Sequence, residues 1–125
     1  MNENEIASMI INASVELHRN TGPGLLESVY ENAMAFDLRQ LGLEISQQVP
    51  LPFIYKDVRM DVGYRVDILV NQKVIIELKA IEFLAPVHFA QTLTYLKLSK
   101  LKLGLLLNFN GALMKGNIHR LVNNL

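Results

Sequence analysis

The segment GYRVDILVNQKVIIELK (residues 63–79) contains two nearly continuous apolar runs on either side of the polar stretch NQK (residues 71–73). Apolar runs of about four to eight residues that end at polar turn residues indicate strands covered on both faces. The segment therefore predicts a β-hairpin at the centre of a sheet, with strands at 63–70 and 74–79.

Two carboxylates, Asp67 and Glu77, interrupt these apolar strands. A carboxylate in such a place is costly unless it is paired with a positive charge or bound to a metal. Lys79 follows Glu77 by two residues, so both project from the same face of their strand. The three residues therefore indicate either a structural ion pair or a metal site.

The length of the connecting loop decides whether the two carboxylates meet. A two-residue turn would pair Asp67 with Ile76 and would turn Glu77 to the opposite face. A three-residue loop over residues 71–73 places Asp67 directly across from Glu77, and such loops with one left-handed residue are common. Opposite β-carbons lie roughly 5 Å apart, so two bare carboxylates would repel unless a cation lay between them. We predict the three-residue loop, or a bulge with the same effect.

Helical spacing of apolar residues predicts two helices before the hairpin. The first helix is expected to have Asn4 as its N-terminal cap and to end at a left-handed Gly22 followed by Pro23. The second helix is expected from about Leu25 to Leu41. Its predicted buried side consists of Leu26, Val29, Tyr30, Ala33 and Leu41.

Strands and a third helix complete the pattern. The β region Ile45–Leu51 is followed by a turn at residues 56–57, and prolines in this region favour an edge or irregular strand. Pro86 begins a helix that runs to about Ser99, and Leu103–Leu107 is a buried strand, parallel to an earlier one, followed by an edge strand at Ile118–Val122. The order α-α-β-β-β-α-β predicts one α/β domain over residues 1–125.

Polar residues on the helices are candidates for extending the site. Glu27, expected one turn into the second helix, is a candidate third oxygen ligand, although an acid there also simply suits the helix dipole. Gln91 and Tyr95 lie four residues apart and share a face of the third helix, so both are candidates for hydrogen bonds at the site. The alternative is a core Tyr95 and a surface Gln91. His88, one turn before Gln91, is a candidate for lining the cleft.

Composition excludes several classes of protein. The chain has no cysteine, which excludes disulfides, thiolate metal sites and cysteine nucleophiles. Hydrophobic residues make up 50% and charged residues 19%, which favours a globular core over disorder. No apolar run is long enough for a membrane span, and the acidic N-terminus lacks signal-peptide character, so we expect a cytoplasmic protein. The histidines lack metal-ligand spacing, and neither a glycine-rich phosphate loop nor a serine nucleophile elbow occurs.

The net charge is zero, but the charges are unevenly distributed. All 12 acidic residues precede Phe83, and every charged residue that follows Phe83 is basic. Such asymmetry indicates a surface that faces a polyanion, although scattered solvated lysines explain it equally well. The basic residues after Phe83 are Lys97, Lys100, Lys102, Lys115 and Arg120.

Four motifs in this order resemble known families. GLLESVY (residues 24–30) resembles the signature that names the GxxExxY protein family. Asp67 followed by ELK (residues 77–79) resembles the D…ExK core of the PD-(D/E)xK nuclease superfamily, and QTLTY (residues 91–95) is similar to the QxxxY motif of its RecB-like exonuclease branch. LGLLLNFN (residues 103–110) is similar to the strand after that helix in GxxExxY proteins. The resemblance covers most of the chain.

This resemblance implies a restriction-endonuclease-like αβββαβ core, with a mixed central sheet flanked by helices and an extra N-terminal helix. The implied activity is metal-dependent hydrolysis of nucleic-acid phosphodiester bonds, with Mg²⁺ or Mn²⁺ as cofactor and DNA as the expected substrate. The basic residues expected to hold the nucleic-acid backbone are Lys97, Lys100, Lys102 and Arg120.

The same resemblance implies roles for individual residues. Lys79 would orient or activate the attacking water, and Gln91 would steady the phosphate or a metal-bound water. Val66 stands where the superfamily's name has a proline, a change that branches of the superfamily tolerate. The implied metal ligands are Glu27, Asp67, Glu77 and the carbonyl of Leu78.

Two alternatives compete with an active nuclease. A catalytically silent nuclease-fold module would bind nucleic acid or a protein partner, but it would be expected to lack a ligand, whereas the acids and Lys79 are all present. A structural protein with a buried Asp67–Lys79 salt bridge would leave the order of the motifs unexplained. A homodimer is also considered, because exposed apolar residues are expected around Leu101–Leu107.

Overall fold

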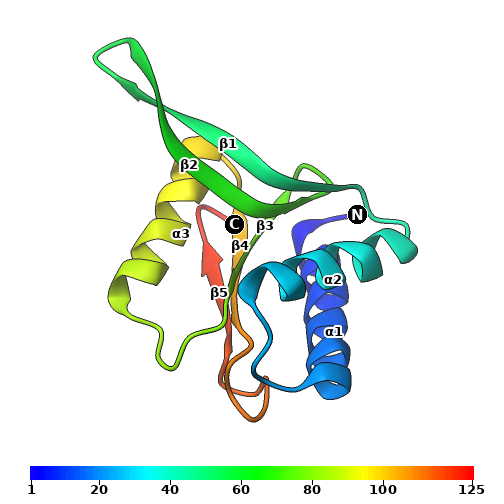
Figure 1. Cartoon of the computed structure of the whole chain (residues 1–125). Helices are drawn as coiled ribbons and strands as arrows, with labels where there is room; N and C mark the ends of the chain where they lie inside the picture. Colours follow the sequence, from blue (N-terminus) through cyan, green and yellow to red (C-terminus); the bar gives the residue numbers. More distant parts are fainter.

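The computed structural model describes residues 1–125 and contains three α-helices and five β-strands, which form one mixed sheet (Figure 1). The expected α/β class and the expected order of elements are both confirmed, including the final edge strand. The elements are α1 (Glu3–Thr21), α2 (Glu27–Gln40), β1 (Ile45–Tyr55), β2 (Val58–Val70), β3 (Val74–Lys79), α3 (Pro86–Ser99), β4 (Leu103–Asn108) and β5 (Ile118–Val122).

The strands lie in the order β1-β2-β3-β4-β5, so that β3 is the central strand. Only β3 and β4 are parallel, and all other neighbours are antiparallel. A parallel pair requires a crossover connection, which α3 provides on one face of the sheet. Helices α1 and α2 cover the other face, so the molecule has three layers (Figure 1).

Alternation along β3 divides the core between these two faces. Val74, Ile76 and Leu78 belong to the larger apolar cluster, which α1 and α2 share. Ile75 packs with Leu96 of α3 in a smaller cluster on the other face. Residues two apart on a strand share a face, so Glu77 lies on the same face of the sheet as Ile75, opposite the larger apolar cluster.

The β1–β2 hairpin is longer than expected. β1 extends to Tyr55 and β2 begins at Val58, with the expected turn at residues 56–57 between them. The far end of this hairpin projects beyond the layer of α3 (Figure 1). None of the helices combines the length and the hydrophobicity that crossing a bilayer would require.

The start of α1 differs from the sequence prediction. Its N-cap is Asn2 and not Asn4. The Asn2 Oδ1 atom accepts a hydrogen bond from the Glu5 backbone N–H at 2.8 Å, and Glu5 Oε1 accepts one from the Asn2 N–H at 3.1 Å. This reciprocal capping box requires an acid three residues after the cap, a condition that Asn4 does not meet. The predicted end of the helix is confirmed, because α1 stops at Thr21 with Gly22 as its C-terminal cap; Gly22 has a positive φ of 67° but an extended ψ of −174°, so it does not adopt the left-handed helical conformation that was expected.

The predicted buried side of α2 is largely wrong. Leu26, Val29 and Leu41 are exposed and Ala33 is only half-buried, whereas Tyr30 is buried as expected. Two apolar rows run along this segment, and packing selects the row that continues from Tyr30 in steps of four residues. The residues of α2 that are buried are Tyr30, Met34, Ala35 and Leu38.

The expectation of exposed apolar residues around Leu101–Leu107 is also wrong. Leu101 is half-buried, and residues 103–107 are all buried, because β4 lies between β3 and β5 and is covered on both faces. The feature that favoured a homodimer is therefore absent from the surface.

A glycine on β4 sets how closely α3 approaches the sheet. A Cβ atom added to Gly104 would lie 3.2 Å from Thr92 Cγ2 and 3.5 Å from Leu96 Cδ1. These distances are at or below ordinary van der Waals contact, so even a methyl group would crowd the helix.

We predict that Gly104→Ala destabilises the protein by about 1 kcal/mol, because α3 must shift or distort to admit the methyl group. Thr92→Ser removes the opposing Cγ2 methyl but keeps the hydroxyl that donates to the His88 carbonyl. Urea unfolding of both single variants and of the double variant measures the coupling. Purely additive effects in this cycle would contradict the close contact.

Candidate active site

The loop between β2 and β3 has the predicted length. Val70 pairs with Val74, which leaves residues 71–73 as a three-residue loop. Two of these residues, not one, are left-handed, with φ values of 51° for Asn71 and 56° for Gln72. Continuing this register by one step beyond the last ladder pair brings Asp67 opposite Glu77.

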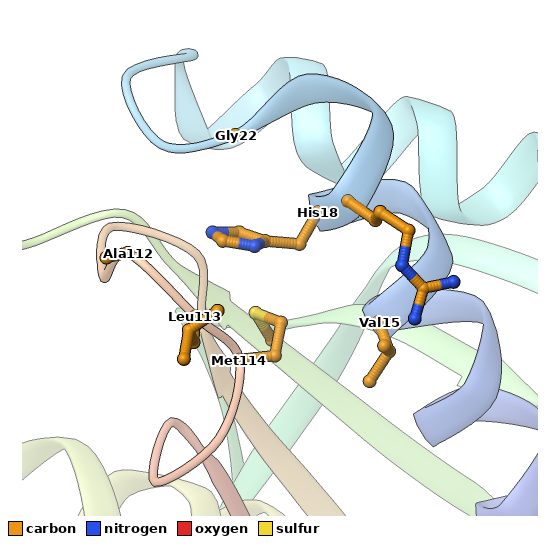
Figure 2. Close-up of a pocket in the computed structure, with 7 residues that line it drawn as sticks. Val15, His18, Gly22, Ala112, Leu113 and Met114 are labelled. Carbon is orange, nitrogen blue, oxygen red and sulfur yellow. The ribbon is translucent and has the colours of Figure 1, made fainter.

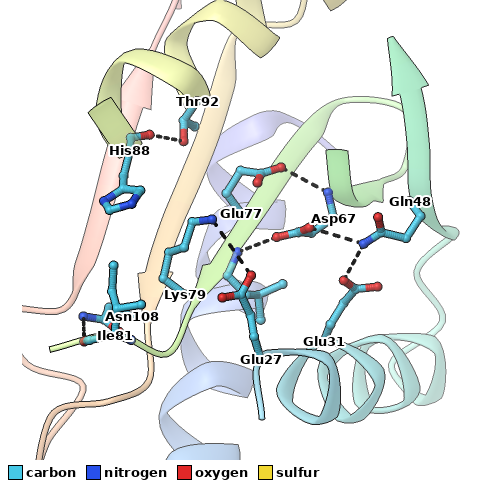
Figure 3. A network of polar contacts seen from close by, with 11 residues as sticks. Glu27, Glu31, Gln48, Asp67, Glu77, Lys79, Ile81, His88, Thr92 and Asn108 are labelled. Atoms are coloured by element: carbon cyan, nitrogen blue, oxygen red, sulfur yellow. Dashed lines mark hydrogen bonds and ion pairs between the residues drawn. The ribbon is translucent and has the colours of Figure 1, made fainter. Parts of the chain in front are cut away.

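At Asp67, hydrogen bonds from backbone N–H groups to side-chain carboxylates replace the backbone hydrogen bonds between β2 and β3. The pairing of β2 with β3 ends at Ile68 and Ile76. Beyond that point the Asp67 N–H donates to Glu77 Oε1 at 3.0 Å, and the Leu78 N–H donates to Asp67 Oδ2 at 2.9 Å (Figure 3). Each carboxylate thus satisfies a backbone donor of the opposite strand, and the two acidic groups are held side by side where the strands separate.

Glu77 is 5% exposed, and burial is the main reason why its pKa rises from 4.5 to about 9. The charge of Asp67 raises this pKa further, whereas the Asp67 N–H and the ammonium of Lys79 lower it. Lys79 therefore offsets only part of the cost of ionising the buried Glu77. A cation beside Glu77 would relieve the remainder.

Lys79 lies beside the start of α2. Its Nζ is 3.9 Å from Glu27 Oε1, and the Lys79 side chain is 22% exposed. The alternative of a buried Asp67–Lys79 salt bridge is wrong, because the carboxylate that Lys79 contacts is Glu27. Burial raises the pKa of Glu27, and Lys79 opposes that rise. Glu27 is the first residue of α2, rather than one turn into it.

Tyr30 and Gly24 fix the position from which Glu27 reaches the sheet. Gly24 has a φ of 109°, a conformation that favours glycine. The Tyr30 hydroxyl donates to the Gly22 carbonyl and accepts from the Leu25 N–H at 3.3 Å. The Tyr30 ring stacks on Phe109, with centroids 4.5 Å apart. These contacts hold the loop before α2, so its first residue is directed at Lys79.

Two residues that were not predicted from the sequence contact Asp67 or its neighbours. Gln48 Nε2 donates to Glu31 Oε1 at 2.7 Å and to Asp67 Oδ1 at 3.3 Å, which links β1, α2 and β2 (Figure 3). Glu31 follows Glu27 by four residues and therefore shares its helix face, a signal that was available in the sequence. Gln48 required knowledge of the β1–β2 register and has a φ of 51°.

Asn108 is a third missed residue, with a structural role. It is buried and pairs with Lys79 across the parallel strands. Its Nδ2 donates to the Ile81 carbonyl at 2.9 Å, and its Oδ1 accepts from the Ile81 N–H at 3.2 Å. Asn108 thereby fixes the chain where it leaves β3, immediately after Lys79.

The two residues of the predicted QxxxY motif have different surroundings. Tyr95 is buried and packs edge-on against Tyr64, with ring centroids 5.8 Å apart. Burial raises the pKa of Tyr95, and the charge of Glu77 adds to that rise. Gln91 is exposed and lines a groove of about 320 Å³ that Tyr64 also lines. The structure thus has a core Tyr95 and a surface Gln91, which was the alternative interpretation.

The predicted basic residues Lys97, Lys100 and Lys102 are exposed. They lie at the C-terminal end of α3 and in the turn that follows it. Arg120, on β5, is also exposed and donates a hydrogen bond to the Asn4 side chain.

A separate pocket of about 370 Å³ lies between the end of α1 and residues 112–114 (Figure 2). His18 lines this pocket, and its Nε2 atom is 2.8 Å from the Gly111 carbonyl oxygen. None of the predicted site residues lines it. The candidate chemistry therefore lies at the cluster around Asp67 and Glu77, outside this pocket.

The cluster provides suitable donor atoms for a hard divalent cation. No three histidine, aspartate or glutamate side chains are close enough, as they stand, to hold a metal ion. However, carboxylate oxygens are the ligands that Mg²⁺ prefers, and Asp67 and Glu77 already lie side by side. Burial, and secondly the charge of Asp67, raise the pKa of Glu77, and a cation that replaced its proton would stabilise the ionised carboxylate. The residues present therefore fit a divalent metal.

The chain belongs to the PD-(D/E)XK nuclease superfamily, because a model of that family matches residues 4–121. Three helices and a five-stranded mixed sheet agree with the restriction-endonuclease-like fold of this superfamily. No curated protein and no solved structure matches the chain in the same comparisons.

The buried Glu77 leads to a prediction for Glu77→Gln in EDTA. A carboxyl group whose pKa is raised by folding stabilises the protein fully below its unfolded value of 4.5, and that contribution is lost as the pH rises toward about 9. The wild type should therefore lose stability relative to Glu77→Gln as the pH rises, by at most about 3 kcal/mol at neutral pH.

Urea unfolding at several pH values measures this difference, and Glu82→Gln controls for removal of a carboxylate at an exposed position. Mn²⁺ or Mg²⁺ should stabilise the wild type more than Glu77→Gln. A stability difference that does not grow with pH would contradict the burial of an uncompensated charge at Glu77.

Proposed function

We propose that residues 1–125 form one nuclease domain that hydrolyses phosphodiester bonds of nucleic acid, with DNA as the substrate and Mg²⁺ or Mn²⁺ as the cofactor. The observation that carries this proposal is the pair of adjacent carboxylates, Asp67 and Glu77, with Lys79 two residues further along β3. Membership of the PD-(D/E)XK nuclease superfamily supports the same activity.

The metal would be held by Asp67, Glu77 and the carbonyl of Leu78, with Glu27 as the acid from α2. The Leu78 N–H already contacts Asp67, so the backbone of this residue lies beside the carboxylates. When bound, the metal would neutralise phosphate charge and lower the pKa of a water molecule. Its binding competes with the proton of Glu77, so affinity should increase with pH.

Lys79 would place an ammonium group where negative charge develops on the phosphoryl oxygens. Its contact with Glu27 at 3.9 Å limits the positions that the flexible side chain occupies. Asn108 supports this arrangement, because it fixes the chain at Ile81, two residues after Lys79. The role of Lys79 is therefore to orient or activate the attacking water and to stabilise the transition state.

Within the superfamily, we assign the chain to the GxxExxY family and to the RecB-like branch. Each named residue of GxxExxY has a local reason in support: Gly24 has a positive φ, Glu27 faces Lys79, and Tyr30 fastens the loop between them. We assign Gln91 to contact with the phosphate or a metal-bound water.

The basic residues would hold nucleic acid at a distance from the cleavage site. An α-helix rises about 1.5 Å per residue, so Lys97 lies about 13 Å along α3 from His88 in its first turn. Lys100 and Lys102 lie further in the same direction, and Arg120 is on β5. Contacts to the phosphates of the nucleic acid carry little information about its base sequence, so the sequence preference should be low.

We predict that Asp67→Ala, Glu77→Ala and Lys79→Ala each reduce Mg²⁺-dependent cleavage by about 100-fold or more, because each removes a ligand or the ammonium. Cleavage of DNA and RNA is measured with Mg²⁺, with Mn²⁺ and with EDTA, and circular dichroism verifies folding. Full activity of Lys79→Ala would rule out the mechanism. A wild type that binds nucleic acid but cleaves none with either metal would instead be a silent binding module.

We predict that Lys100→Gln/Lys102→Gln weakens DNA binding and lowers the slope of log K against log salt by about two, because each phosphate contact contributes about 0.9. Arg19→Gln/Arg39→Gln on α1 and α2 is the matched control, because it removes the same charge from the opposite layer. Equal salt slopes for the two double variants would exclude these lysines from the binding surface.

A further inference from the structure

His88 caps the helix on which it lies, and this contact determines the tautomer of its neutral ring. The Ala85 backbone N–H donates to His88 Nδ1 at 2.9 Å. A backbone amide can only donate, so Nδ1 carries no hydrogen and the neutral ring must carry its hydrogen on Nε2. The residue therefore presents a hydrogen-bond donor of fixed direction.

The first turn of α3 lies over the same row of the sheet as Glu77. The ring of Phe89 packs edge-on against His119, with centroids 5.0 Å apart. His119 pairs with Leu106, and Leu106 pairs with Glu77. Thr92, one turn further along α3, lies against Gly104, so the helix runs antiparallel to β4. His88 is consequently at the level of Glu77.

The Nε2 atom of His88 has no hydrogen-bond partner in the protein. No fully buried side-chain nitrogen or oxygen lacks a partner, so this atom is open to solvent. The His88 ring points from α3 toward Asn108 and the end of β3 that carries Lys79 (Figure 3). The donor therefore faces the end of β3 from which Lys79 projects.

We propose that His88 Nε2–H donates a hydrogen bond to a phosphate oxygen of the nucleic acid bound at Asp67 and Glu77. The inference rests on the proposed function and adds a phosphate-binding residue from α3 to a site otherwise built by α2, β2 and β3. A hydrogen bond to an anionic oxygen is stronger than one between neutral groups and fixes the position of the phosphate. The ring thereby acts as helix cap and ligand contact at once.

Two uncharged substitutions separate the two roles of His88. In His88→Asn the Oδ1 atom occupies the place of Nδ1, so the cap is kept, but nothing reaches the place of Nε2. In His88→Gln the side-chain amide reaches the place of Nε2 and supplies a donor there. His119→Gln is the control for loss of a ring from the same row of the sheet.

The experiment measures binding of a fluorescent DNA oligonucleotide to the full chain by anisotropy, in Ca²⁺ and in EDTA. His88→Asn should keep the melting temperature of the wild type and lose about tenfold in affinity, which is the loss expected for one hydrogen bond to a charged group. His88→Gln and His119→Gln should remain within about twofold of the wild type. The imidazole ¹⁵N resonance of His88 Nε2 should shift when DNA is added.

Each other outcome overturns a defined part of the argument. If the wild type binds DNA and His88→Asn binds equally well, His88 is only a helix cap and the proposed function stands. If the Nε2 resonance stays unchanged while DNA binds, the contact is likewise absent. If the wild type neither binds nor cleaves nucleic acid, the proposed function fails and the role of His88 fails with it.

Discussion

The separation of β2 from β3 at Asp67 is the constraint on which the rest of the site depends. Where the backbone ladder stops, two N–H groups need acceptors, and the carboxylates of Asp67 and Glu77 supply them. Burying unpaired amides would be costly, so these contacts have a structural reason of their own. The same contacts hold two acidic groups side by side, and burial together with the charge of Asp67 raises the pKa of Glu77, so that a cation is needed for both groups to be ionised.

The sequence predicted those parts of the site that depend on one hairpin. Two acids in apolar strands, a lysine two residues later and a three-residue loop were sufficient to place Asp67 beside Glu77. Strand alternation is regular, so the spacing of residues 67–79 converts directly into geometry. The overall α/β order followed equally well, because the long apolar runs and the helix ends at Gly22 and Pro86 give strong local signals.

The rest depended on packing between distant segments. The face of α2 that enters the core could not be read from its own sequence, because two apolar rows compete and contacts with α1 and the sheet decide between them. Gln48 reaches Asp67 only through the β1–β2 register, and Asn108 reaches Ile81 across the parallel strands. The apolar run at residues 103–107 predicted a buried parallel strand, but the place of β4 between β3 and β5 in the sheet could not be predicted from it.

The stacking of Tyr30 on Phe109 has a mechanical consequence. Tyr30 fastens the loop that aims Glu27, while Phe109 directly follows the strand whose last residue, Asn108, braces the exit from β3. The contacts that direct Glu27 toward Lys79 and the contacts of Asn108 beside Lys79 are thus connected by the stacking of Tyr30 on Phe109. A substitution that loosens the packing of Tyr30 or Phe109 would therefore affect both groups of contacts that position Lys79.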